Sequence, residues 1–441
     1  MFRWVRCVRS SWLFSDYRFA QLELHSKLQT PLKSLGFERL TQVQANSFTS
    51  VSNLKDVVLS SETGSGKTLA YLLPIMSGVL FEGRGRALGR GSPCVIVLPS
   101  AELCAQVLSV IRRFVGSDHS LVSCQMLTGT RHTIDDNGVI LAPRIRWGMV
   151  DVVVCTPSMF AADIERFRSE KLYPSRVVFD EADLLFHGSD SAHMDMILRY
   201  LRPRHAPGAG TNIPSGGAQA STTPTVCTRT GIPTQCIFSS ATFSHVGPNS
   251  IGSMLFRRFP NAVCIQTENF HAIPVGLKTE WIGDSGDWES RCLALSELLP
   301  QYTKNRILVF VNSKSNGKIL HTFLGEAGFI SNLFIRHQSG GVNKLDVDSP
   351  ICVCTDLAAR GIDWENIDLV VNFQMPTDAV AWIHRAGRTG RMGSDGKVIS
   401  FYKHSEAPFV NKLRAAADVG NLATVFSNKR SLGRKSRSLV A

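Results

Sequence analysis

The feature that most constrains the fold of this chain is a short loop, residues 61–68, which reads Ser-Glu-Thr-Gly-Ser-Gly-Lys-Thr. An apolar run at 56–60 precedes it and another at 69–74 follows, an order that predicts a strand, a glycine turn and a helix. Backbone N–H groups and a helix N-terminus then converge on one point and can bind an anion. Lys67 can reach the β- and γ-phosphates of a nucleotide, and the Thr68 hydroxyl can be a ligand of Mg²⁺. The loop therefore predicts a nucleoside triphosphate site, with a chance Gly/Ser turn as the alternative.

The amino-acid composition indicates the broad class of protein to which the chain belongs. The 441 residues predict two or three domains, and 44% hydrophobic with 19% charged residues is ordinary for an α/β protein. No apolar run approaches the length of a membrane span, so we expect no membrane insertion. The net charge of +12 favours an anionic partner, most often nucleic acid, although a solvated surface or an organellar composition would also give it. Eleven cysteines without a CxxC pair predict neither a disulfide framework nor a zinc ribbon.

The N-terminus has a composition of its own. Residues 1–15 hold three arginines, three serines and no acidic residue, between apolar side chains. This composition is typical of a mitochondrial transit peptide, and a disordered basic tail is the alternative.

The rest of the chain alternates between short apolar runs and segments with helical spacing. This alternation predicts βαβ units and parallel sheets, with functional residues at the carboxyl ends of the strands. The pattern restarts near residue 276. We therefore expect two tandem α/β domains, each a mostly parallel sheet flanked by helices. The expected segments are a basic extension at 1–18, a first domain at 19–268 with a disordered insertion at 203–233, a linker at 269–277, a second domain at 278–418 and a basic tail at 419–441.

Several polar segments follow the predicted strands. Asp180-Glu181-Ala182-Asp183 closes the run at 177–179, where Asp180 is placed to hold a metal ion and Glu181 to orient or deprotonate a water. Ser240-Ala241-Thr242 follows a later strand, and residues 355–363 close another. Residues 384–391, His-Arg-Ala-Gly-Arg-Thr-Gly-Arg, add three arginines.

This ordered set of motifs resembles the DEAD-box ATP-dependent RNA helicases, from about residue 19 to about residue 414. The resemblance implies two RecA-like domains that close on ATP and RNA together. It also implies a role for each matching residue. Phe19 would stack on the adenine and Gln44 would read its edge, while the phosphates would be held by Ser61, Glu62, Thr63, Gly64, Ser65, Gly66, Lys67 and Thr68. Mg²⁺ would be held by Thr68 and Asp180, and the ribose would contact Asp363. Catalysis would use Lys67, Glu181, Arg388 and Arg391, and coupling to RNA would use Asp183, Ser240, Thr242 and His384. For Phe19, core packing is a serious alternative.

The RNA-facing segments depart from the family pattern. Ala101 stands where the family has an arginine, Thr128 where it has a glycine, and Ser158-Met159 where it has Gly-Arg. Residues 337–350 are a short connection for a parallel crossover, which needs about a dozen residues or more, and a family helix that contacts RNA is expected to be missing there. Strand separation is therefore less firmly predicted than ATP binding.

We expect an RNA-dependent ATPase that unwinds or remodels RNA duplexes or RNA–protein complexes, binding the RNA backbone without sequence preference. A nucleotide-gated RNA clamp or assembly factor with weak or no unwinding is the alternative, and a DNA helicase is disfavoured by Gln44 and the DEAD spelling. The termini resemble those of organellar members. We therefore expect a mitochondrial monomer that acts on ribosomal RNA with ribonucleoprotein factors, the nucleus, nucleolus or cytoplasm being alternative locations.

Overall fold

The computed structural model describes most of both expected domains. The described residues are 4–6, 14–62, 64–82, 92–115, 122–128, 133–134, 140–141, 150–169, 173–187, 190–202, 233–242, 250–267, 277–284, 287–302, 306–335, 349–359, 367–390 and 395–418. Nearly all of the expected insertion, most of the linker, the connection after residue 335 and the basic tail lie outside these ranges.

The first domain is built on a wholly parallel sheet. Its eight strands follow the order β1-β12-β4-β11-β10-β5-β9-β6, and every neighbouring pair is parallel. The strands are β1 Trp4–Arg6, β4 Val57–Ser60, β5 Cys94–Val97, β6 Cys124–Leu127, β9 Val152–Cys155, β10 Arg176–Phe179, β11 Gln235–Ser240 and β12 Val263–Gln266.

Helices cover both faces of this sheet because successive side chains of a buried strand point to opposite sides. On β4, Val57 and Leu59 join one core cluster and Val58 joins the other. The first cluster includes α1 Ser26–Ser34, α2 Gln42–Ser52, α3 Lys67–Glu82 and α4 Ala101–Val115. The second includes α5 Pro157–Ala162, α6 Ile164–Ser169, α7 Ala182–His187, α8 Ser191–Leu201 and α9 Ile251–Arg258.

The second domain repeats this plan with six parallel strands in the order β13-β18-β17-β14-β16-β15. The strands are β13 Leu277–Asp284, β14 Ile307–Val311, β15 Ser331–Phe334, β16 Ile351–Thr355, β17 Leu369–Asn372 and β18 Gly396–Lys403. One face packs against α10 Trp288–Leu298 and α11 Lys314–Glu326. The other packs against α12 Asp356–Ala359, α13 Ala379–Ala386 and α14 Ala407–Asp418.

Short elements complete the described structure. Two small antiparallel sheets pair β2 Phe14–Arg18 with β3 Arg39–Thr41 and β7 Thr133–Ile134 with β8 Ile140–Leu141. Three 3₁₀ helices are η1 Phe19–Gln21, η3 Leu299–Tyr302 and η5 His404–Glu406. Among the described helices, none combines the length and the apolar character needed to span a bilayer.

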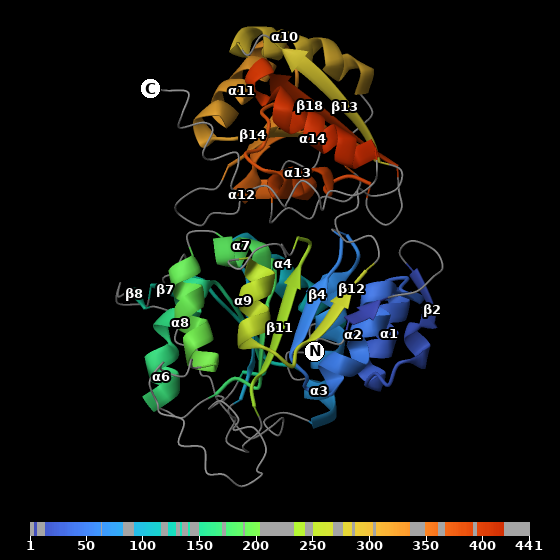
Figure 1. Ribbon diagram of the computed structural model, residues 1–441, viewed down its shortest axis with the longest axis vertical. Coiled ribbons are helices and arrows are strands. Elements are labelled where there is room, and N and C mark those ends of the chain that lie inside the picture. Colours follow the sequence, from blue (N-terminus) through green and yellow to red (C-terminus); the bar gives the residue numbers. More distant parts are fainter. Residues whose placement is uncertain are drawn as a thin grey trace, which may run out of the picture.

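The expected architecture of two tandem parallel α/β domains is confirmed. Paired structure begins earlier than residue 19, because β1 pairs with β12 and β2 with β3, and residue 277 belongs to β13. The domains lie end to end, and the arrows of β11 and β12 point toward the second domain (Figure 1). Because the strands of the first sheet are parallel, their carboxyl ends share that edge.

Candidate nucleotide site

The phosphate loop leaves the carboxyl end of β4, a strand buried along its whole length. Gly64 and Gly66 have positive φ angles of 80° and 85°, which only glycine adopts without strain. Ser61 N–H donates to the carbonyl of Ser240 at 3.3 Å, and the hydroxyls of Ser61 and Ser65 lie 2.6 Å apart. These bonds fix the loop between β4 and β11.

Lys67 is the first residue of α3 and is 9% exposed. Its Nζ donates to the carbonyls of Ser61 and Glu62, at 2.8 Å each. The ammonium group therefore lies inside the loop, at the positive end of a helix, where an anionic phosphate group is stabilised. The Glu62 carboxylate accepts from the Thr267 hydroxyl at 2.6 Å, so Glu62 ties the loop to the residue after β12.

Gln44 lies directly behind the loop. Its Nε2 donates to the Gly66 carbonyl at 3.2 Å, and its Oε1 accepts from Thr41 N–H at 3.0 Å in a capping box at the start of α2. Phe19 is 4% exposed and packs edge-on against Phe37, with ring centroids 6.2 Å apart. Phe19 thus belongs to the core of the first domain, and its stacking on adenine stays a prediction, as does the reading of the base by Gln44.

Asp180 follows β10 and is held at both carboxylate oxygens. Oδ1 accepts from Glu181 N–H at 3.0 Å and Oδ2 from the Tyr71 hydroxyl at 2.8 Å. Burial, together with the negative charge of Glu181, raises the pKa of Asp180 to about 6, although Ser239, Tyr71 and Lys67 act in the opposite direction. Glu181 has a φ of 50°, rare for a residue with a side chain, and its Oε2 is buried without a hydrogen-bond partner among the described residues.

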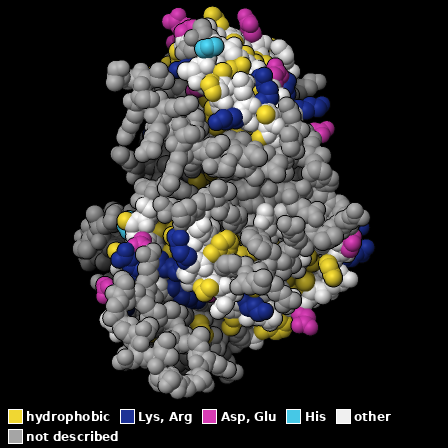
Figure 2. All heavy atoms as spheres, in the orientation of Figure 1, with side chains coloured by type: hydrophobic (Ala, Val, Ile, Leu, Met, Phe, Trp, Pro, Cys, Tyr) yellow, Lys and Arg dark blue, Asp and Glu magenta, His cyan; other side chains and the backbone are white. Residues whose placement is uncertain are grey.

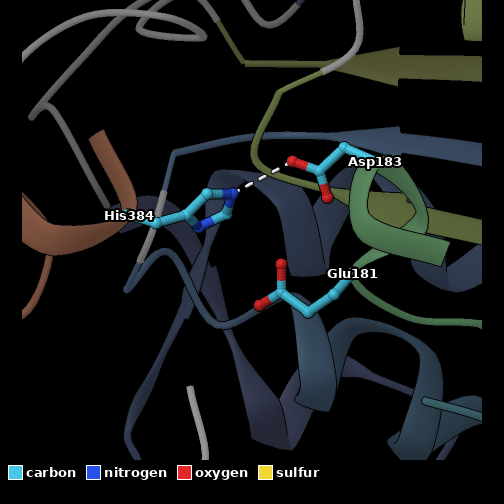
Figure 3. A group of neighbouring side chains, drawn as sticks. All are labelled: Glu181, Asp183 and His384. Carbon is cyan, nitrogen blue, oxygen red and sulfur yellow. Dashed lines mark hydrogen bonds and ion pairs between the residues drawn. The ribbon is translucent and has the colours of Figure 1, made fainter. Parts of the chain in front are cut away.

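Asp183, in the first turn of α7, joins the two domains. It accepts a hydrogen bond from the Thr242 hydroxyl, and its Oδ2 lies 3.0 Å from Nε2 of His384 on α13 of the second domain. Figure 3 shows this contact, with the Glu181 carboxylate beside it. Burial alone would raise the pKa of Asp183, but His384 and hydrogen bonds from Thr242 and Ser240 lower it to about 2.

Two arginines follow His384 within the described residues. Arg388 donates from Nε to the His384 carbonyl at 3.3 Å, at the carboxyl end of α13. Arg385 is 1% exposed and forms two bonds to Asp356, at 2.5 and 2.7 Å, and further bonds to Asn312 and Asn372. Sequence reasoning assigned no role to Arg385 or to Tyr71, since neither spacing nor residue type reveals a buried partner distant in the chain.

The expected site residues thus converge at one edge of the first sheet. Asp180, Asp183, Ser240 and the phosphate loop meet there, and one atom each of Glu181, Asp183 and His384 lies within 4.8 Å of the others. Thr63, Asp363 and Arg391 lie outside the described residues.

Two of the segments expected to face RNA begin helices at the same edge. Ala101 is the first residue of α4, which follows β5. Ser158 and Met159 lie in the first turn of α5, which follows β9. Thr128, directly after β6, is 4% exposed. Backbone amides at such positions can contact phosphates, but none of these side chains supplies a cation.

The two parallel α/β domains contribute to one site, which combines a phosphate loop, a pair of strand-end carboxylates and a histidine contact between the domains. This combination defines a nucleoside triphosphatase with a two-domain site. The sequence model described as DEAD/DEAH box helicase matches residues 41–249, and the one described as helicase conserved C-terminal domain matches residues 290–393. The chain belongs to the DEAD-box family of ATP-dependent RNA helicases.

Two curated relatives align over nearly the whole chain. The ATP-dependent rRNA helicase RRP3 of Encephalitozoon cuniculi (strain GB-M1) is 27% identical over 404 residues, 90% of this chain and 88% of the relative. The DEAD-box ATP-dependent RNA helicase 22 of Oryza sativa subsp. japonica is 26% identical over 494 residues, 94% of this chain and 83% of the relative.

Solved structures share the fold. S. cerevisiae Dbp5 bound to RNA and ADP BeF3 has a TM-score of 0.68 at 22% identity, covering 91% of this chain and 93% of that chain. Mss116p bound to ssRNA and AMP-PNP has a TM-score of 0.72 at 20% identity, covering 94% and 80%.

Proposed function

We propose that this chain hydrolyses ATP to unwind or remodel RNA duplexes or RNA–protein complexes. The observation that carries the proposal is the contact of Asp183 with His384. A buried carboxylate beside the catalytic Glu181 is bonded to both Thr242 of the first domain and a histidine of the second. Chemistry at the nucleotide therefore depends on the position of the second domain, and a ligand that brings the domains together can stimulate hydrolysis.

The residues present fit a Mg²⁺·ATP complex. The loop amides and Lys67 suit the phosphates, and the hydroxyl of Thr68 and the carboxylate of Asp180 are the oxygen donors that Mg²⁺ prefers. Bound there, Mg²⁺ would neutralise charge on the phosphates. The unsatisfied Oε2 of Glu181 can accept a proton from the attacking water. Arg388, one turn after His384, is the described residue of the second domain that can stabilise charge on the transferred phosphoryl group.

RNA is the partner that the family and the basic charge support. On the face drawn in Figure 2, Lys and Arg side chains lie on both domains. Contacts of this kind bind phosphates and carry no sequence information, so we propose backbone binding without sequence preference. Ribosomal RNA within the mitochondrion is the proposed target, from the acid-free composition of residues 1–15 and the relative named as an rRNA helicase.

The test compares ATP hydrolysis, in the presence of single-stranded RNA, by the wild-type chain and by Glu181→Gln. We expect the variant to bind ATP but to hydrolyse it about 100-fold or more slowly, because the amide cannot accept the proton of the water. The control is Glu165→Gln, since the Glu165 side chain is 81% exposed on α6 and pairs with the surface residue Arg168. Equal turnover by Glu181→Gln and the wild-type chain would refute the assignment.

A nucleotide-gated clamp is the second candidate, favoured by the missing cations at Ala101 and Met159. Displacement of a short RNA duplex separates the two activities. A helicase releases the strand in proportion to ATP hydrolysed, whereas a clamp holds single-stranded RNA in the presence of a non-hydrolysable ATP analogue and releases no strand.

A further inference from the structure

Tyr71 is buried beside the nucleotide site, where it contacts Asp180. It follows Thr68 by about one turn of α3 and is 0% exposed. Its hydroxyl donates to Oδ2 of Asp180 at 2.8 Å. The phenol group therefore holds one of the two side chains to which the metal ion is assigned.

The hydrogen bonds to Asp180 limit the directions in which its carboxylate can bind a cation. A carboxylate offers about four lone-pair directions. In Asp180 one is used by Glu181 N–H and one by Tyr71, so the plane of the group and its remaining directions are set. The Tyr71 ring packs in the core cluster of α1 to α4. An aromatic residue that served the core alone would need only this ring and no hydroxyl.

We propose that Tyr71 is a positioning residue for the divalent cation, acting through Asp180 without touching the cation or the nucleotide. The proposal rests on the function proposed above and names a residue that this site uses. Residues that hydrogen-bond to a metal ligand without touching the metal typically change metal affinity about 10–100-fold when they are removed.

The test is Tyr71→Phe in the full chain, which removes the hydroxyl and keeps the ring. Mn²⁺ serves as the probe, and its binding to the complex with a non-hydrolysable ATP analogue is followed by electron paramagnetic resonance. Binding of the same analogue without metal, in EDTA, and the midpoint of thermal unfolding are measured beside it. The control is Tyr200→Phe, since Tyr200 is also a buried tyrosine of the first domain, 3% exposed and stacked on Phe167 and Tyr173.

We expect Tyr71→Phe to weaken Mn²⁺ binding about tenfold, with metal-free nucleotide affinity and unfolding midpoint preserved, and Tyr200→Phe to leave Mn²⁺ binding unchanged. Unchanged Mn²⁺ affinity in Tyr71→Phe would overturn the proposal. So would an equal loss of metal-free nucleotide affinity, or an unfolded variant, because the hydroxyl would then serve the loop or the fold. A wild-type chain that fails to bind the Mn²⁺·nucleotide complex would overturn the proposed function as well, which separates the two failures.

Discussion

At the scale of single residues, the two aspartates of the DEAD sequence differ in their ionisation. Both are buried, but Asp180 lies beside the Glu181 carboxylate, and its pKa is raised to about 6. Asp183 bonds to His384 and Thr242, and its pKa is lowered to about 2. The sequence predicted separate roles for them, yet it could not predict these opposite shifts, because His384 is 201 residues away.

The raised pKa of Asp180 predicts a pH dependence. Its ordinary value is 3.8, so a pKa of about 6 means that the group is ionised above about pH 6 and takes up a proton below it. A protonated carboxyl binds cations poorly, so Mn²⁺ affinity of the nucleotide complex should fall about tenfold per pH unit below 6. Dividing the Mn²⁺ affinity of the wild-type complex by that of the Asp180→Asn complex at each pH removes the effect of the nucleotide's own titration. A ratio that stays constant down to pH 4 would contradict the shift.

The contact between domains predicts a coupling defect in His384→Ala. The variant leaves the buried Asp183 carboxylate without its partner on the second domain, while the phosphate loop is untouched. We expect ATP affinity to change little and RNA-stimulated turnover to fall about 10-fold or more. His193→Ala is the control, because His193 pairs with Asp190 on the surface of α8 at 3.5 Å. RNA-stimulated turnover equal to that of the control would show that the contact does not serve coupling.

At the scale of elements, the sequence predicted the strands that are buried on both faces. β5 and β14 are continuous apolar runs, β4 and β10 are apolar runs with one polar residue at an end, and the glycine turn after β4 is where the loop motif placed it. The strand β13 was not predicted, because this edge strand alternates between partly buried and exposed residues and has no continuous apolar run. The burial of Arg385 was also missed, since a charged run in a glycine-rich segment is usually solvated.

Two glycines with similar backbone angles predict different outcomes for one substitution. Gly66 has a φ of 85°, and a Cβ there would lie 2.4 Å from Gln44 Nε2. Gly36, after α1, has a φ of 75° with nothing within 4 Å of a Cβ. We expect Gly36→Ala to cost about 1 kcal/mol of stability, from backbone strain alone, and to keep nucleotide affinity. Gly66→Ala should in addition displace Gln44 or the loop and weaken nucleotide binding about tenfold or more. Equal nucleotide affinities in the two variants, measured by calorimetry, would contradict this account of the loop.

At the scale of the whole molecule, the tandem architecture followed from the alternation of strands and helices and from the order of the motifs. How the domains meet did not follow, because the contact of Asp183 with His384 depends on tertiary structure. The segment proposed for mitochondrial targeting, residues 1–15, includes Trp4–Arg6, which forms β1 and pairs with β12.

Removal of residues 1–15 should abolish mitochondrial import of a fluorescent fusion, because this segment supplies the arginine-rich, acid-free composition that import requires. The control replaces Lys435 and Arg437 in the basic tail, which should leave import unchanged. Imaging both fusions beside the full chain is the measurement. Unchanged localisation of the shortened fusion would refute the targeting proposal.

The measurement that tests the central claim most directly is steady-state ATP turnover of the full chain with and without saturating single-stranded RNA. Because Glu181 lies on the first domain and His384 and Arg388 on the second, the site is complete only when the domains meet, and RNA should favour that state. We expect RNA to stimulate turnover about tenfold or more, since a positioned arginine alone is worth ~10³–10⁵ in rate. Single-stranded DNA of the same sequence should stimulate weakly. Turnover that is the same with RNA and without it would contradict the account.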